Sequence, residues 1–238
     1  MTLSTFVNPP SRQGLSQFRY FDLLVSLFIM VLLISNILGQ KICAIGPFRV
    51  GAAQVLFPIT YIFGDVFTEV YGYAASRRAI WLGFLASCLM AAVTAIMVAL
   101  PPAPDWPDQA IYSKVFLMVP RMVIASLLAY WAGEFTNSFV LAKMKIFTQG
   151  RWLWTRTVGS TVTGQAVDTS LFMILAFGGK VGAGTIANLI FSSYFAKVAY
   201  EIIATPLTYA VVNFLKRHEG VDTFDYKTKF SPFHLAAN

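Results

Sequence analysis

The sequence predicts an all-α membrane protein with six transmembrane helices. This expectation rests on its composition, its apolar segments and the positions of its basic residues. Only 12% of the 238 residues are charged and 57% are hydrophobic. Soluble domains carry about 25% charged residues, so this chain has too little polar surface to cover a water-soluble globule. At roughly 20 apolar residues per crossing, its length accommodates six spans joined by short loops.

Two of the six apolar segments contain no charged residue. They are Leu23 to Gln40 and Ala79 to Leu100, the second of which ends before two prolines. Charged residues interrupt the other four, which we expect to run from about Val50 to Tyr73, Phe116 to Phe139, Thr157 to Phe177 and Val181 to Leu215. No short apolar core with a small-residue cleavage site precedes the first span, so we expect this span to act as its own insertion signal.

Basic residues indicate the orientation of the spans, because cytoplasmic loops carry an excess of Lys and Arg. With six spans and both termini in the cytoplasm, cytoplasmic segments hold twelve basic residues and the opposite side holds four. A seventh crossing within the last apolar segment would move the basic residues of the C-terminal tail outside. We therefore predict cytoplasmic tails over residues 1–19 and 216–238, with a six-helix membrane domain over residues 20–215.

Several functional classes are disfavoured by the same composition. The net charge of +7 follows from this topology and from attraction to anionic membrane lipids, so we expect no nucleic-acid partner. Both histidines, His218 and His234, lie in the C-terminal tail, which argues against a His-based metal site within the membrane. The stretch from Gly178 to Thr185 lacks the ending of a phosphate-binding loop. We expect neither a metal nor another cofactor.

Acidic residues within the expected spans are the strongest functional signal. Five of the 11 acids lie there: Asp65, Glu69, Glu134, Asp168 and Glu201. An ionisable group near the bilayer centre costs on the order of 2.5–3.5 kcal/mol on insertion scales, so it must face protein or water. Asp65 and Glu69 share one helical face with Tyr61. Two like charges on one face need a cation, a proton or donor groups between them.

The later spans carry polar residues on one face each. Glu134 lies with Asn137, Gln165 with Asp168, and Lys197 with Glu201. These faces predict a bundle around a polar central cavity. Pro58 and Pro206 also predict a kinked second span and a broken sixth span. A Gly-Asp-Thr pattern near Asp65 and again near Asp168 would fit a 3+3 repeat.

A purely structural role for these charges stays open. Lys197 and Glu201, four residues apart, could neutralise each other. Arg121 could pair with Asp168 or with Glu69, and Glu134 could lie near the headgroups.

Several separate motifs resemble the YhhQ-type queuosine precursor transporters of the vitamin uptake transporter family. They are the run Phe57 to Gly72 followed by Arg77-Arg78, the segments 121–126, 133–138 and 164–169, and Lys197 to Glu201 with Thr205-Pro206. The resemblance extends roughly from Phe21 to Glu219. It implies import of 7-deazaguanine precursors of the tRNA nucleoside queuosine across a bacterial inner membrane. These precursors are the cyano form, preQ0, and the aminomethyl form, preQ1.

The polar residues of the spans would suit such a base. One carboxylate can accept both the N–H and the exocyclic amine of a guanine-like edge, amides can meet the carbonyl and ring nitrogen, and aromatic rings can stack on the bicycle. The expected substrate-binding residues are Asp65, Glu69, Tyr61, Phe57, Gln165, Asp168, Asn137 and Glu134. We expect Arg121, Lys197 and Glu201 to set the electrostatics of the cavity or to carry protons.

Two other functions stay open at this point. The chain could be the substrate-binding subunit of an ATP-driven uptake complex, although its first span lacks the Ala-x-x-x-Ala face on which such subunits commonly dock. It could also be a membrane enzyme that uses paired carboxylates, but it has no nucleophile constellation and no metal ligands. We therefore expect a transporter and not an enzyme. The coupling ion and a homodimeric state stay open.

Overall fold

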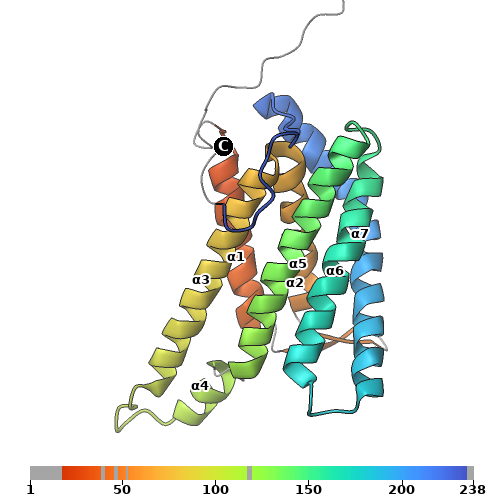
Figure 1. Cartoon of the computed structure of the whole chain (residues 1–238). Helices are drawn as coiled ribbons and strands as arrows, with labels where there is room; N and C mark the ends of the chain where they lie inside the picture. Colours follow the sequence, from red (N-terminus) through yellow and green to blue (C-terminus); the bar gives the residue numbers. More distant parts are fainter. Residues whose placement is uncertain (1–17, 39–40, 46–47, 52, 117–119, 235–238) are drawn as a thin grey trace, which may run out of the picture.

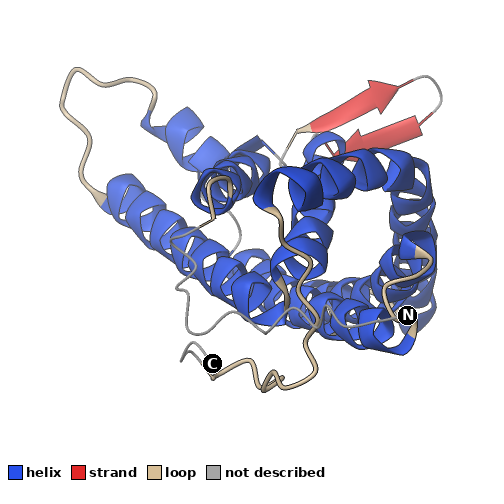
Figure 2. Ribbon diagram, turned by 90° about the horizontal axis from the view of Figure 1, so that it is seen from above, coloured by secondary structure: helices blue, strands red, loops and turns tan. Residues whose placement is uncertain are grey.

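Helices make up most of the described chain (Figure 1). The computed structural model describes residues 18–38, 41–45, 48–51, 53–116 and 120–234, and the structural statements below concern these residues. In chain order the elements are α1 (Phe21–Leu38), β1 (Ile42–Ile45), β2 (Phe48–Gly51), α2 (Ala53–Val66), the π-helical segment η2 (Phe67–Tyr71), α3 (Tyr73–Ala99), α4 (Gln109–Phe116), α5 (Pro120–Phe147), α6 (Leu153–Phe177) and α7 (Ala183–Glu219). The helices stand side by side, and the β-hairpin lies at the edge of the bundle (Figure 2).

Three helices, α1, α3 and α7, are long and apolar enough to cross a membrane. α5 has 28 residues and α6 has 25. At 1.5 Å per residue these helices are ~42 and ~38 Å long, which exceeds the ~30 Å hydrocarbon core. Large apolar side chains are exposed, such as Leu89 at 66% and Ile203 at 77%, as expected for surfaces that lipid covers. The chain is an α-helical membrane protein, as predicted, and the count of six crossings stays a prediction.

The structure differs from the expected segments in several places. The stretch after Pro101, predicted to be a loop, contains the short helix α4, and an antiparallel pair of strands precedes α2. α7 continues through Pro206, where the sequence predicted a break. Proline removes only one backbone hydrogen bond, and membrane helices tolerate this loss. α5 and α6 are also longer than expected, so Lys145 and Arg156 are helical and do not lie in a loop.

Both ends of the described chain lie at one end of the bundle (Figure 1). The backbone N–H groups of Arg19 and Tyr20 donate to the carboxylate of Glu219, at 3.1 and 2.7 Å. These bonds join the start of α1 to the end of α7. An even number of crossings is needed to bring the two ends together in this way.

The C-terminal tail folds back over the beginning of α3. The Asp225 carboxylate accepts a hydrogen bond of 3.0 Å from the Tyr73 backbone N–H. The Arg77 guanidinium donates to the carbonyl oxygens of Lys229 and Ser231, at 2.8 and 3.1 Å. The tail is therefore an ordered part of this end of the bundle.

Glycines allow α5 and α6 to approach closely. A Cβ atom built on Gly133 would lie 2.7 Å from the Cβ of Asp168, and one built on Gly164 would lie 2.8 Å from the Cβ of Asn137. Small residues permit such close contacts between membrane helices. The contact holds the polar face of α5 directly against the polar face of α6.

Candidate functional site

A group of buried and partly buried polar side chains lies where α2, α5, α6 and α7 meet. We call it the central polar cluster, and each helix contributes two members: Tyr61 and Asp65, Glu134 and Asn137, Gln165 and Asp168, and Lys197 and Glu201. Asp65 is 1% exposed and Glu201 is fully buried. All eight residues were singled out from the sequence, and the structure brings them together. Their roles in binding stay predictions.

Asp65 is held by an amide from the neighbouring helix. The side-chain Nδ2 of Asn137 donates to Oδ1 of Asp65 at 3.0 Å. The other carboxylate oxygen, Oδ2, is buried and has no hydrogen-bond partner among the described residues, and the same holds for Oδ1 of Asn137. The pair therefore presents two free acceptor atoms. An ionised carboxylate can only accept hydrogen bonds, so Asp65 directs the Nδ2 of Asn137 toward itself and fixes which way this amide points.

Asp168 is paired with a lysine from the next helix. The ammonium of Lys197 on α7 lies 2.5 Å from Oδ2 of Asp168 on α6. This pairing differs from the alternative in which Lys197 neutralises Glu201 on its own helix. The Tyr61 hydroxyl reaches the same region, where it donates to Oε1 of Gln165 at 3.5 Å. α2, α6 and α7 are thus linked through polar side chains.

Glu134 and Glu201 add two further carboxyl groups. Glu134 is 7% exposed, and its Oε2 lies so close to α2 that a Cβ atom on Gly64 would approach it to 2.8 Å. Glu201 is within electrostatic range of Asp65 and of Glu134. Neither oxygen of Glu201 has a hydrogen-bond partner in the described part of the chain. Glu134 is therefore buried between α5 and α2 inside the bundle.

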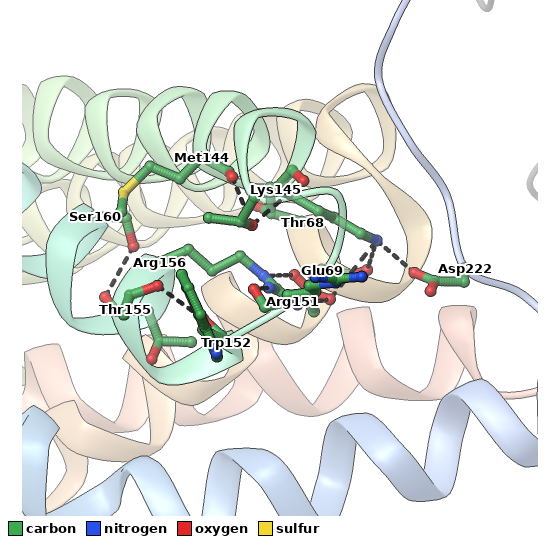
Figure 3. A network of polar contacts seen from close by, with 12 residues as sticks. Thr68, Glu69, Met144, Lys145, Arg151, Trp152, Thr155, Arg156, Ser160 and Asp222 are labelled. Carbon is green, nitrogen blue, oxygen red and sulfur yellow. Dashed lines mark hydrogen bonds and ion pairs between the residues drawn. The ribbon is translucent and has the colours of Figure 1, made fainter.

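Glu69 does not bond to this cluster and belongs to a separate network of charges, which Figure 3 shows from close by. Arg156 donates to its carboxylate through Nε and Nη2, both at 2.7 Å. The ammonium of Lys216 lies 2.5 Å from Oε1, and that of Lys145 lies 3.7 Å from it. We call Glu69, Lys145, Arg156, Lys216 and Asp222 the ion cluster.

The C-terminal tail completes the ion cluster. The Asp222 carboxylate lies 2.6 Å from the ammonium of Lys145 and 2.8 Å from that of Lys216. Lys145 also donates to the backbone carbonyls of Glu69 and Thr223. Partial burial acts to raise the pKa of Asp222, but the two ammonium groups outweigh it and hold that pKa below its ordinary value. The cluster ties η2, α5, α6, α7 and the tail together.

Local backbone geometry positions Glu69. It is the central residue of η2, the π-helical turn that ends α2. Such turns insert one extra residue into a helix and often occur at functional sites. The chain then passes through Gly72, whose φ of +86° favours glycine, before α3 begins. A Cβ atom there would lie 2.7 Å from Cγ2 of Thr223 in the tail.

Two predicted residues lie outside the described side chains. Phe57 is placed on α2 and Arg121 on the first turn of α5, but only their backbone is described. Arg121 precedes Glu134 by thirteen residues on the same helix, a rise of about 20 Å. The backbone of Arg121 is therefore far along α5 from the central polar cluster.

Sequence reasoning missed the basic half of the ion cluster. Lys145 and Arg156 were expected in a cytoplasmic loop, and Lys216 in a tail. In the structure Lys145 and Arg156 are each 1% exposed. The acid at position 69 was a signal that cations were required, but the sequence did not show which ones would be neighbours.

Comparisons with known proteins agree with a transport role. A family model described as "Putative vitamin uptake transporter" matches residues 51–211. A "Probable queuosine precursor transporter" of Bacillus subtilis (strain 168) is 31% identical over 167 residues, which cover 70% of this chain and 73% of the relative. A "Queuosine precursor transporter" of Escherichia coli (strain K12) is 26% identical over 154 residues, or 64% and 67% of the two chains. No solved structure matches this chain.

Proposed function

The chain belongs to the vitamin uptake transporter family, and on that premise we propose that it imports queuosine precursors across a bacterial inner membrane. The substrates are 7-deazaguanine bases, preQ0 and preQ1. The observation that carries this proposal is the central polar cluster, in which buried acceptor atoms lack partners among the described residues, in a chain related to queuosine precursor transporters.

The chemistry of the cluster suits a guanine-like base. Such a base presents a ring N–H and an exocyclic amine side by side, and Asp65 can accept from both. Asn137 keeps Asp65 oriented, and the amide of Gln165 can meet the carbonyl edge of the base. Tyr61 supplies an aromatic face for stacking. Asp168 with Lys197, and Glu134 with Glu201, set the charge around the bound base.

Glu69 has a different role in this proposal. Its carboxylate is already engaged by the cations of the ion cluster, so a substrate could bind it only by displacing them. We assign it to holding one end of the bundle together. From the excess of basic residues at this end we infer that it lies in the cytoplasm, with six crossings and both tails on that side.

The direct test is uptake of labelled preQ0 and preQ1 into proteoliposomes that contain only this protein. Asp65→Asn removes the charge but keeps the shape, and we expect it to lower uptake of both precursors about tenfold or more, the usual effect of a lost hydrogen bond to a charged group. Asp105→Asn, at an exposed loop position, is the matched control. Membrane insertion of each variant is checked by detergent extraction and gel filtration.

Each outcome of this experiment has a defined meaning. Saturable uptake by the wild-type chain alone supports a self-sufficient transporter. Binding without uptake would point to a subunit of an ATP-driven complex. Unchanged uptake in both Asp65→Asn and Asp168→Asn would contradict the assignment of the central polar cluster as the binding site.

A further inference from the structure

The central polar cluster contains more negative than positive groups. Its described side chains include four carboxyl groups, those of Asp65, Glu134, Asp168 and Glu201, and one ammonium, that of Lys197. Lys197 is committed to Asp168 at 2.5 Å. Three carboxyl groups therefore remain without a cationic partner among the described side chains. Buried carboxylates are costly unless a cation or several donors compensate them.

The atoms of this cluster that lack a hydrogen-bond partner among the described residues are all acceptors. They are Oδ2 of Asp65, Oδ1 of Asn137 and both oxygens of Glu201. An ionised carboxylate accepts hydrogen bonds only, and the Asn137 oxygen is likewise an acceptor. A ligand that satisfies these atoms must supply several N–H or O–H donors. A positive charge on that ligand would also reduce the imbalance of charge.

Glu201 has more oxygens without a hydrogen-bond partner than any other described member of the cluster. Its side chain is fully buried, and both of its oxygens lack a hydrogen-bond partner in the described chain. On the neighbouring helices, Asp65 on α2 and Glu134 on α5 lie within electrostatic range of it, and both are acidic. Lys197, one turn earlier on α7, points its ammonium to Asp168 instead.

We propose that Glu201 is the counter-ion for a primary ammonium group carried by the transported base. In this assignment, which rests on the proposed function, Asp65 and Asn137 take the polar edge of the base and Glu201 takes the charged substituent. An ammonium has three N–H donors and one positive charge, and it matches the two free oxygens of Glu201. Glu201 thereby discriminates the aminomethyl precursor from the cyano precursor, whose nitrile offers no donor and no charge.

The two precursors differ at this substituent, so together they form the test. Wild-type protein, Glu201→Gln and Glu201→Asp are compared for uptake of preQ0 and preQ1 into proteoliposomes and for thermal stabilisation by each precursor in detergent. Glu201→Gln is expected to weaken uptake and binding of preQ1 about tenfold or more, because a charge-assisted bond is lost. For preQ0, whose nitrile makes no such bond, the loss is expected to be clearly smaller, so the ratio of preQ1 binding to preQ0 binding falls. Glu201→Asp, which keeps the charge, should recover part of the preference for preQ1.

Other outcomes would overturn the assignment. If Glu201→Gln lowered the uptake of both precursors equally and left their binding unchanged, Glu201 would act in the transport step and not in recognition of the substrate. If Glu201→Gln weakened the binding of preQ0 and preQ1 equally, Glu201 would be a structural residue. Unchanged affinity for preQ1 would exclude contact with the ammonium. If the wild-type protein neither binds nor transports either base, the proposed function fails, and this assignment fails with it.

Discussion

Asp65 and Glu69 lie one helical turn apart, yet their carboxylates have different surroundings. Asp65 receives one hydrogen bond from Asn137, and its other oxygen is buried with no partner in the part of the chain that the structure describes. Glu69 is met by Arg156, Lys145 and Lys216. A carboxylate with free acceptor capacity can take up a ligand, whereas a fully paired one stabilises the protein. At the scale of single residues, the partners and not the residue type separate binding from stability.

The ion cluster leads to a prediction about stability. In Arg156→Gln the two bonds to Glu69 are lost, and a buried carboxylate loses its best partner. Breaking a buried ion pair from one side costs about 3–5 kcal/mol, so we expect a clearly lower unfolding temperature in detergent. Arg78→Gln, at an exposed position on α3, serves as the control. Equal unfolding temperatures for the two variants would show that the cluster does not hold this end together.

The sequence was sufficient to select the members of the central polar cluster, because charged and amide groups within apolar spans are costly and few. It could not supply the pairings. Glu69 and Arg156 are separated by 87 positions, and Asp168 and Lys197 lie on different helices. Such pairs depend on which helices become neighbours, which the periodicity of one helix does not determine.

At the scale of elements, the contact between α5 and α6 determines the geometry of the candidate site. Gly133 and Gly164 remove side-chain atoms from this interface, and the backbones approach there. Asn137 and Asp168 lie against these glycines, so their positions follow the spacing of the two helices. The apolar segments of the sequence predicted both helices, but they placed the end of α5 and the start of α6 several residues short, because the charged residues there indicated a loop.

Two glycines on α6 allow a controlled test of this contact. A Cβ atom at Gly164 would meet Cβ of Asn137 at 2.8 Å and the carbonyl oxygen of Gly133 at 3.1 Å, whereas one at Gly159 would meet the flexible end of Met144. Gly164→Ala should therefore destabilise the protein by about 1–3 kcal/mol and reduce precursor uptake. Gly159→Ala should have little effect on either measurement. Similar behaviour of the two variants would contradict a rigid α5–α6 contact.

At the scale of the whole molecule, the two chain ends meet at one end of the bundle, where the ion cluster and the folded-back tail also lie. This end carries most of the basic residues that predicted the cytoplasmic side. The opposite end holds α4 and the β-hairpin, which the sequence did not predict (Figure 1). Short amphipathic segments outside the spans leave a weaker pattern than the spans themselves.

This arrangement predicts where reporters fused to the chain will be active. A fluorescent protein fused after residue 238 should fluoresce, because it folds in the cytoplasm, and alkaline phosphatase fused there should be inactive. Phosphatase fused in the exposed stretch before α4, at Asp105, should be active. Active phosphatase at the C-terminus would contradict six crossings with both tails inside.

The ion cluster also has a consequence for how the protein is made. One of its two acids, Glu69, leaves the ribosome 147 residues before Lys216, and the other, Asp222, follows later still. At about 5–20 residues per second, roughly 7–30 seconds pass between the synthesis of Glu69 and that of Lys216. During that interval the early helices hold an incompletely neutralised carboxylate, and only nearly finished chains can close the cluster. A chain that stalls or is cut before the tail lacks this closure, so quality-control proteases have a physical basis for distinguishing it from a complete one.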